Sequence, residues 1–384
     1  MIFDVIALLA LAIWAYLLAG RGRFWLCRER DAARLPAPPR WPRVTAVIPA
    51  RNEADGIALS IGSLARQDYP GAFSIVLVDD DSDDGTADLA RHAASALKAD
   101  HTFTLIQSRG VAPGWTGKLW AMRQGVEAAS SVAVSPDYLL LTDADIVHTP
   151  DSVRALVERA EQGRYVLTSL MAKLRCESAA ECVHVPAFVY FFQMLFPFAW
   201  VNDTRRPTAA AAGGCMLVKA DALKQAGGIE SIRSALIDDC SLAQRMKTVG
   251  PIWLGLTGRV FSIRSYHWAE ARKMVSRSAY AQLNYSPLLL AAMTLGMALT
   301  FLAGPVLALF GDGIAQLLGA VTWAVMALSF QPMLRFYKMS PLWGLALPAI
   351  ALAYMIYTLD SAWRTVRGRG GEWKGRVQAS VSQS

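Results

Sequence analysis

Long uncharged stretches lie at both ends of the chain, and shorter hydrophobic runs fill the region between them. Residues 1–20 are apolar apart from Asp4 and could cross a bilayer as a helix, which takes about 20 residues. Three more uncharged stretches lie near the other end: Leu288–Phe310, Ile314–Phe330 and Pro341–Leu359. The pattern predicts a membrane anchor at 1–20 and C-terminal membrane segments within 286–360.

Basic residues set the expected orientation of the first segment. No positive residue precedes it and no small-x-small cleavage site follows it. Four arginines come next: Arg21, Arg23, Arg28 and Arg30. We therefore expect an uncleaved anchor rather than a signal peptide, with its C-terminal side in the cytoplasm.

The charges near the C-terminal end conflict with four crossings. The connector 311–313 holds no Lys or Arg and is expected outside, whereas Arg335 and Lys338 favour the inside. The basic tail, 361–384, also favours the inside through Arg364, Arg367, Arg369, Lys374 and Arg376. Four crossings from an outside N-terminus would place that tail outside. We therefore expect one C-terminal segment to be re-entrant or to lie in the membrane interface.

The middle of the chain has the pattern of an α/β domain. A basic, proline-rich linker, 21–42, precedes it, and the domain is expected over 43–285. The expected strands are Val44–Ile48, Ser74–Val78, Thr102–Ile106 and Tyr138–Thr142, with helices from about Glu53, after Asp84, from Gly117 and after Pro150. Strands separated by such helices predict a mostly parallel sheet with flanking helices, in which ligands bind beyond the carboxyl ends of the strands.

One segment, Val185–Val201, does not follow this alternation. It has seven aromatic residues and no charge, and Pro186 and Pro197 interrupt it. A core helix is one interpretation. A full crossing would place the acidic motifs on either side of it on opposite sides of the membrane. We expect an interfacial helix that leans on the bilayer.

Composition narrows the class of protein. Of 384 residues, 54% are hydrophobic and 18% are charged, against a usual charged share of about 25%. This excludes intrinsic disorder and a purely water-soluble protein. The net charge of +7 is compatible with nucleic acid, anionic lipid or phosphate-bearing substrates, and of these partners we expect no nucleic acid. Five cysteines without a CxxC pair argue against a disulfide framework or a zinc site and favour a reducing compartment.

The first acidic cluster, 79–84, follows an expected strand and holds five carboxylates in six positions. Asp83 and Asp84 fit a helix N-terminus, where they cap the helix and meet its positive dipole end. That explanation leaves Asp79 and Asp80 at the strand end. A carboxylate there can accept a hydrogen bond from a base N–H or a ribose hydroxyl.

The second cluster, Asp143-Ala144-Asp145, follows the apolar strand Tyr138–Thr142. In a strand, positions i and i+2 share one face, so we expect the two carboxylates on one face, where they could hold Mg²⁺ or Mn²⁺. A turn with a helix cap before Pro150 is the structural alternative.

The third cluster, Asp238-Asp239, opens an expected helix. One acid is enough for a cap, so the second is a candidate general base.

Several other motifs are excluded. The chain has no G-x-G-x-x-G, and Gly117-Lys118 lacks both the first Gly and the final Ser or Thr of a phosphate-binding Walker loop. Among the histidines, only His267 is a candidate for a functional role, and a structural role is more common for such a residue.

In combination, the motifs resemble the family 2 glycosyltransferases, which have the GT-A fold, over about residues 41–270. The matching stretches are 48–53 (IPARNE), 78–86 (VDDDSDDGT), Gly117-Lys118, Asp143-Ala144-Asp145, Gly213-Gly214, and Asp238-Asp239 with Leu242 and Arg245. The apolar ends and 373–376 (WKGR) are similar to the membrane-bound branch of the family. The stretches 113–118 (PGWTGK) and 277–283 (RSAYAQL) resemble the hopanoid-biosynthesis-associated glycosyltransferases.

This resemblance implies a role for each matching position. Ala50, Glu53, Asp79 and Asp80 would line a uridine pocket, and Lys118 would lie near the nucleotide. Asp143 would contact the sugar or ribose and, with Asp145, the divalent metal on the diphosphate. Gly213 and Gly214 would let the chain pass close to the donor sugar. Asp239, beside Asp238, would be the catalytic base.

The implied activity is inverting transfer of one sugar from a nucleotide-diphosphate sugar, most simply a UDP-sugar, to a membrane lipid, with a hopanoid as the candidate acceptor. The QxxRW motif of processive members is absent, which favours single-sugar transfer. The implied location is the inner membrane, as a multi-pass protein with a cytoplasmic catalytic domain. A nucleotidyltransferase and a non-catalytic membrane scaffold of the same fold remain alternatives. A channel or transporter is disfavoured because the apolar segments hold almost no ionisable residues.

Overall fold

The computed structural model describes residues 1–95, 101–131 and 134–367, and the backbone of 372–373 and 376–377. Arg369, and Lys374 and Gly375 of the tail motif, therefore lie outside the described residues. The chain divides into two compact units. Among the described residues, the helical unit comprises 1–28, 176–199 and 265–367, and the sheet unit comprises those of 29–175 and 200–264 together with 372–373 and 376–377.

The sheet unit is built on an eight-stranded sheet in the order β3-β2-β1-β4-β7-β6-β8-β5. The strands are β1 (Val44–Ala50), β2 (Phe73–Asp79), β3 (Thr102–Gln107), β4 (Tyr138–Thr142), β5 (Ile146–His148), β6 (Leu167–Lys173), β7 (Cys215–Lys219) and β8 (Ile252–Ser262). Strands β3, β2, β1 and β4 are parallel. Strand β7 runs antiparallel to both β4 and β6, and β5 runs antiparallel to β8. The α/β prediction is confirmed, and the second half of the sheet is mixed.

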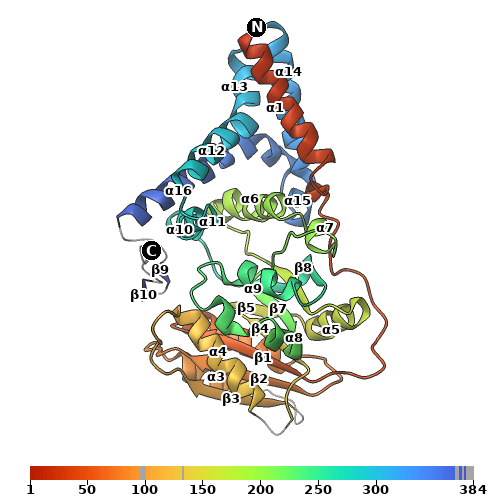
Figure 1. Cartoon of the computed structure of the whole chain (residues 1–384), viewed down its shortest axis with the longest axis vertical. Helices are drawn as coiled ribbons and strands as arrows, with labels where there is room; N and C mark the ends of the chain where they lie inside the picture. The colour runs from red at the N-terminus through yellow and green to blue at the C-terminus, as the bar shows by residue number, and fades with distance from the viewer. Residues whose placement is uncertain (96–100, 132–133, 368–371, 374–375, 378–384) are drawn as a thin grey trace. The chain divides into compact units, whose positions relative to one another are not determined.

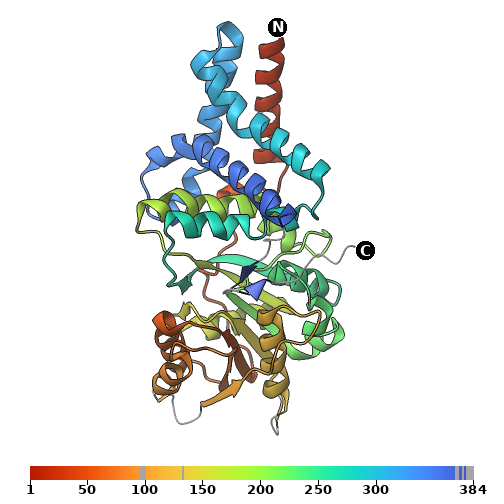
Figure 2. The same cartoon turned by 90° about the vertical axis from the view of Figure 1, so that its left-hand side faces the viewer.

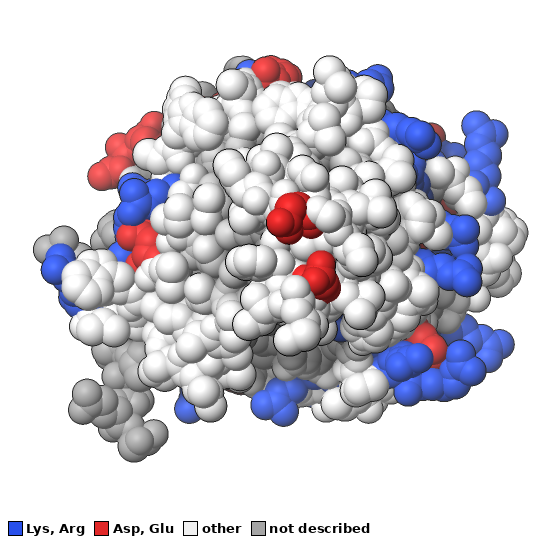
Figure 3. All heavy atoms as spheres, turned by 90° about the horizontal axis from the view of Figure 1, so that it is seen from above, with Lys and Arg blue, Asp and Glu red and all other residues white. Residues whose placement is uncertain are grey.

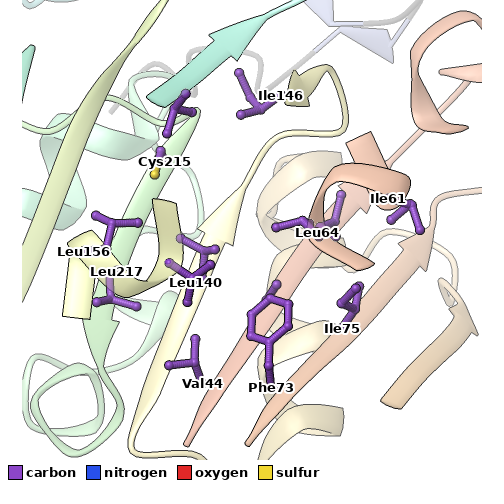
Figure 4. Close-up of a cluster of buried hydrophobic side chains, with 14 of the residues drawn as sticks. Val44, Ile61, Leu64, Phe73, Ile75, Leu140, Ile146, Leu156, Cys215 and Leu217 are labelled. Atoms are coloured by element: carbon purple, nitrogen blue, oxygen red, sulfur yellow. The ribbon is translucent and has the colours of Figure 1, made fainter. Parts of the chain in front are cut away.

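Helices of the sheet unit connect and flank these strands: α2 (Ala54–Ala65), α3 (Thr86–Ala94), α4 (Gly117–Ser130), α5 (Ser152–Gly163), α8 (Ala220–Gln225) and α9 (Asp238–Lys247). Every residue of β1 and β4 is buried, as in a sheet covered on both faces. Figure 4 shows part of this core, in which Phe73, Ile75 and Leu140 face Leu64. The continuous apolar runs of the sequence are therefore central strands.

Helix α4 approaches the sheet closely through Gly125. A Cβ there would stand 2.5 Å from Val47 Cγ1 and 2.9 Å from Val78 Cγ2. This glycine lets α4 cross β1 and β2 at short range, which places Lys118, near the start of α4, close to the strand ends.

The helical unit holds four helices that are long and apolar enough to cross a membrane, among the described residues. They are Ile2–Ala19 (α1), Pro287–Phe310 (α12, a π-helical turn and α13), Gly313–Phe336 (α14 and α15) and Pro341–Val366 (a 3₁₀ turn and α16). Figure 3 looks down on the end that bears the N-terminus, and two acidic residues but no basic ones lie near the centre of that view.

Helices α1, α13 and α14 pack along one another. The Trp14 indole N–H donates at 2.7 Å to the Thr300 carbonyl, in the π-helical turn that precedes α13, and its ring meets Phe301 of the same turn edge to face. A Cβ on Gly319 would stand 2.7 Å from the Gly304 carbonyl oxygen, so these two glycines let α13 and α14 approach. Small residues at such a contact are typical of membrane helices.

The aromatic segment forms most of α6 (Ala179–Leu195) and the short α7 (Phe198–Val201). Helix α6 runs through Pro186, so that proline does not interrupt it, and Pro197 follows its end. Tyr190 is fully buried, with its ring 5.1 Å from that of Phe330. Much of the aromatic content therefore serves packing inside the helical unit, and the expected position at a membrane interface stays a prediction.

Candidate active site

The acidic motifs meet at one edge of the sheet. Strands β1, β2 and β4 are parallel and end at Ala50, Asp79 and Thr142. Because β7 is antiparallel to β4, its start, just after Gly213-Gly214, lies at the same edge. The topology therefore brings together residues that are far apart in the sequence.

Two loops at this edge are joined by hydrogen bonds. The Asp84 carboxylate accepts from the backbone N–H of Ala54 and of Thr86, the first residues of α2 and α3. The Thr86 hydroxyl accepts from the Glu53 N–H at 2.9 Å. Asp84 thus serves the helix N-termini, as expected for part of this cluster, and fixes the loop after β1 against the loop after β2.

Asp79 and Asp80 are candidates for binding a ligand. Asp79 is 3% exposed, and its Oδ1 has no hydrogen-bond partner among the described residues. Arg51 donates to the Asp80 carbonyl at 2.5 Å and lies 3.8 Å from its carboxylate. An unmet acceptor in a buried position is costly unless a ligand supplies a donor, which is what a base N–H or a ribose hydroxyl would do.

Lys118 links two of the acidic clusters. Its ammonium lies 2.9 Å from Asp143, just after β4, and 3.0 Å from Asp238, at the start of α9. Burial opposes the charge of the lysine, but the two carboxylates outweigh it and raise the pKa of Lys118 above its usual value. Burial also raises the pKa of Asp143 against the opposing effect of Lys118. Lys118 is therefore a fixed cation among carboxylates.

Asp239 lies beside Asp238, but it is bonded to the backbone rather than paired with Lys118. Its two oxygens accept backbone hydrogen bonds, Oδ2 from Gly213 at 2.9 Å and Oδ1 from Cys240 at 2.7 Å. Burial and the neighbouring Asp238 raise the pKa of Asp239 to about 6, against the lowering effect of those bonds and of Lys118. Neither acid caps α9, because Ile237 is the N-cap residue. A carboxylate with this pKa is suited to accept a proton near neutral pH.

The carboxylates of Asp143 and Asp145 point to different partners. Asp145 Oδ2 accepts from the Ser262 hydroxyl and from Arg264 Nε, both at 3.1 Å. Arg264 also pairs with Glu53 at 3.2 Å. The expectation that both acids share one face of a strand is wrong, because β4 ends at Thr142 and a turn follows.

The acidic residues fit a divalent cation only in part. No group of three or more His, Cys, Asp or Glu side chains in the described ranges is arranged to hold a metal. Yet both hydrogen bonds of Asp145 fall on Oδ2, and its side chain is partly exposed. Mg²⁺ is commonly bound by one or two carboxylates, and phosphate oxygens of a substrate and waters complete its shell. The donor set suits that arrangement, and the roles of Asp143 and Asp145 as ligands stay predictions.

A buried network of hydrogen bonds joins the end of β4 to the residue that precedes β7. The Thr142 hydroxyl donates to the Gly214 carbonyl at 2.7 Å and lies 3.1 Å from His148 Nε2. His148 Nδ1 lies 3.2 Å from the Ser152 hydroxyl. Burial lowers the pKa of His148 to about 3, so the ring is neutral.

The sequence pattern did not single out Arg264, Thr142 or His148. Arg264 follows the end of β8, where nothing in the local pattern marks it. His148 and Thr142 sit inside short apolar runs, where only their polar side chains could have signalled buried partners. His267, which the pattern did flag, is the N-cap residue of α10 (Trp268–Ser276) in the helical unit, and its backbone N–H donates to Glu270.

Comparison with known proteins identifies the domain. Residues 45–227 match the model of glycosyl transferase family 2. An N-acetylglucosaminyltransferase from Rhizobium leguminosarum bv. viciae is 35% identical over 120 residues, which are 31% of this chain and 25% of that protein. An undecaprenyl-phosphate 4-deoxy-4-formamido-L-arabinose transferase from Pseudomonas aeruginosa is 33% identical over 132 residues, 34% of this chain and 36% of that protein. The matched region thus spans well under half of these relatives.

A solved structure shows the same fold over nearly the whole chain. The mannosyltransferase PcManGT from Pyrobaculum calidifontis, in complex with GDP-Man and Mn²⁺, superposes with a TM-score of 0.56 at 19% identity, covering 93% of this chain and 99% of that one. At this identity the likeness shows the fold alone. Together with the mixed sheet and the family match, it shows that the chain carries a glycosyltransferase domain of GT-A-like fold, in which residues 45–227 match family 2, and long apolar helices that could span a membrane.

Proposed function

We propose that the protein is a membrane-bound inverting glycosyltransferase that moves one sugar from a nucleotide-diphosphate sugar to a hydroxyl group of a lipid. The observation that carries the proposal is Asp239, a half-buried carboxylate with a pKa of about 6. It lies against Gly213 and beside the ion-paired Lys118–Asp238, at the edge where Asp79 presents an unmet acceptor.

The donor would bind across the strand ends. Asp79 and Asp80, together with Ala50 and Glu53, are the residues we assign to the nucleoside, on the basis of the unmet acceptor and the joined loops. A UDP-sugar is the donor we favour, because the sequence motifs resemble those of UDP-sugar enzymes. Gly213 and Gly214 are assigned to the sugar because the chain there has no side chain to exclude it. A bound Mg²⁺ or Mn²⁺ would neutralise charge that develops on the diphosphate leaving group.

The chain's own residues would then move the proton. Asp239 accepts the proton of the acceptor hydroxyl while that oxygen bonds to the anomeric carbon and the bond from carbon to the diphosphate oxygen breaks. One displacement inverts the configuration at that carbon. Lys118 holds Asp143 and Asp238 in place and keeps the cluster from acquiring a large negative charge.

The acceptor is assigned from two observations. The apolar helices point to a membrane, and several relatives are named as undecaprenyl-phosphate transferases. A lipid phosphate is already ionised near neutral pH and needs no base, whereas a hydroxyl does. The pKa of Asp239 therefore favours a hydroxyl-bearing lipid, with a hopanoid as our candidate, and the inner membrane with a cytoplasmic catalytic domain as its location.

The test is transfer of radiolabel from a panel of UDP- and GDP-sugars into lipid extracts by membranes that contain the protein. Wild type should label a lipid in a divalent-ion-dependent way, and Asp239→Asn should not. Two acceptor sets, lipids with a free hydroxyl and polyprenyl phosphates, are supplied separately. Label in the phosphate lipid alone, undiminished in Asp239→Asn, would overturn the assignment of the acceptor. No label with any donor would overturn the proposed reaction.

A further inference from the structure

The last apolar helix, α16 (Leu347–Val366), differs from the other three candidate membrane spans in its pattern of faces. One face is buried in the helical unit and includes Tyr354, Thr358 and Ser361. A second face is apolar but exposed, through Leu352, Ile356, Leu359, Trp363 and Val366. These five positions are spaced by four, three, four and three residues, so they form one continuous stripe along the helix.

The buried face of α16 is bonded to helices that lie outside the α1–α13–α14 bundle. The Tyr354 hydroxyl donates to the His184 carbonyl of α6 at 2.8 Å, and His184 Nε2 lies 3.0 Å from the Tyr357 hydroxyl. Ser361 accepts from the backbone N–H of Tyr280, in α11 (Ala279–Gln282), at 3.1 Å. Helix α16 therefore rests on α6 and α11 over at least two turns.

A third, charged face ties α16 to the polar helix α10. Asp360 pairs with Arg272 of α10 at 2.8 Å and with Arg364, one turn further on, at 2.9 Å. Helix α10 also carries Glu270 and Lys273 within its nine residues, so it cannot lie in the hydrocarbon core. The last two turns of α16 therefore lie at the depth of a charged helix.

The direction of α16 agrees with its contacts. Within the helical unit, Figures 1 and 2 both show α16 running crosswise to α1 and α14, which lie beside each other. The guanidinium of Arg367 lies 4.4 Å from the ring of Trp363. A tryptophan in an apolar stripe bordered by arginines is typical of a helix in the membrane interface.

We propose that α16 lies in the plane of the membrane, on the cytoplasmic leaflet, with its stripe of Leu352, Ile356, Leu359, Trp363 and Val366 in the lipid. Three of the four candidate spans then cross the bilayer. An odd number of crossings is needed because the N-terminus is expected outside and the basic tail inside. Arg335 and Lys338, after α14, and Arg364 and Arg367, in and after α16, come to lie on the same side. The basic border suits anionic phospholipid headgroups. This proposal does not depend on the reaction that the sheet unit catalyses.

Depth measurements with spin labels test the proposal. Single cysteines replace Leu352, Ile356, Leu359 and Trp363 in a chain whose less buried native cysteines, Cys176 and Cys182, are alanine; the other three are buried. The labelled protein is placed in vesicles of phosphatidylethanolamine and phosphatidylglycerol. If α16 lies in the plane, all four labels stay shallow and agree in depth to within about one helical turn, 5 Å. A crossing helix would spread them over a length of about 16 Å and carry at least one to the bilayer centre.

Helix α14 supplies the matched control, because Leu317, Val321 and Leu328 are exposed apolar positions on a span that we expect to cross. Labels there should show a deep centre flanked by shallower positions. A second measurement does not depend on labelling: reporter fusions at both ends of the chain should report opposite sides of the membrane. Ends on the same side, or a deep label on α16, would overturn the proposal.

Discussion

The carboxylate of Asp239 is the residue whose ionisation should control the rate. Since burial and Asp238 raise its pKa to about 6, the base form is lost as the pH falls through that value. The transfer rate at saturating donor should therefore rise from about pH 5 to a plateau above about pH 7, which initial rates across this range will show. Asp239→Asn should lose about 10²–10⁴ in rate while it still binds nucleotide.

Asp238→Asn is the matched control for that prediction, because it removes the neighbouring carboxylate and leaves Asp239 in place. Its loss should be smaller. If Asp238→Asn is the less active of the two and both bind UDP normally, the base is Asp238. If both retain transfer, neither acid is the base.

Lys118 should act on the pH profile through its charge. It lowers the pKa of Asp239, so Lys118→Gln should move the acid limb of the profile to higher pH. The variant also leaves Asp143 and Asp238 without their shared cation, and its maximal rate should fall. An acid limb at the wild-type position would show that Lys118 does not act electrostatically on Asp239.

Asp145 is predicted to be the main protein ligand of the divalent ion. Asp145→Asn should abolish metal-dependent turnover and weaken the binding of Mn²⁺ with UDP, measured by calorimetry, in a protein that remains folded and in the membrane. Ser262→Ala removes only a hydrogen bond to the same carboxylate and should be much milder. Normal turnover and normal Mn²⁺ binding by Asp145→Asn would remove the residue from the site.

At the scale of elements, the chain Ser152–His148–Thr142–Gly214 fixes the end of β4 against the start of β7. His148→Gln places an amide group, which can donate or accept, near the position of Nε2 and should keep near-normal kinetics. His148→Asn is too short to reach Thr142 and should lower kcat about 10-fold to 100-fold, because Gly213, next to Gly214, holds Asp239. Steady-state kcat and KM of both variants decide the matter.

The pH profile and the comparison of the two variants show whether His148 acts by positioning Gly213 and Asp239 or by its own ionisation. The pKa of His148 is held near 3 by burial, so the imidazole is neutral over the whole profile. The acid limb should therefore keep its position in His148→Gln. Equal losses in the glutamine and asparagine variants would indicate that the ring only fills space.

Regular alternation made the first half of the sheet predictable. Tyr138–Thr142 coincides with β4, and the other three expected strands are extended by one or two residues at their ends. Strand β7 was not expected. Its five residues follow an alanine-rich stretch, and its partner β4 lies more than 70 positions earlier, so only long-range pairing defines it.

The sequence predicted which residues belong to the candidate site, but not which carboxylate pairs with which cation. Asp79, Lys118, Asp143 and Asp239 stand at strand or helix ends that the pattern placed correctly. Which carboxylate meets which cation depends on how α4 and α9 lie against the sheet. Arg264 pairs with Glu53 across more than 200 residues, and no local pattern reports such a contact.

At the scale of the whole molecule, neighbouring residues in the sequence belong to different units. The segment 176–199 leaves the sheet unit after β6, contributes α6 to the helical unit, and returns before β7. Local apolar patterns could flag α6 as unusual, but its aromatic side chains are buried against Phe330 and Tyr354, which lie well over 100 residues further along.

This interleaving has a consequence for proteolysis. In the described part of the chain, the backbone passes between the units at 28–29, 175–176, 199–200 and 264–265. A protease that cuts once, even in the proline-rich stretch after residue 30, leaves the other passages intact. The sheet unit should therefore stay with the membrane fraction after such a cut. Its release would require several cleavages, including one before α6 and one after it.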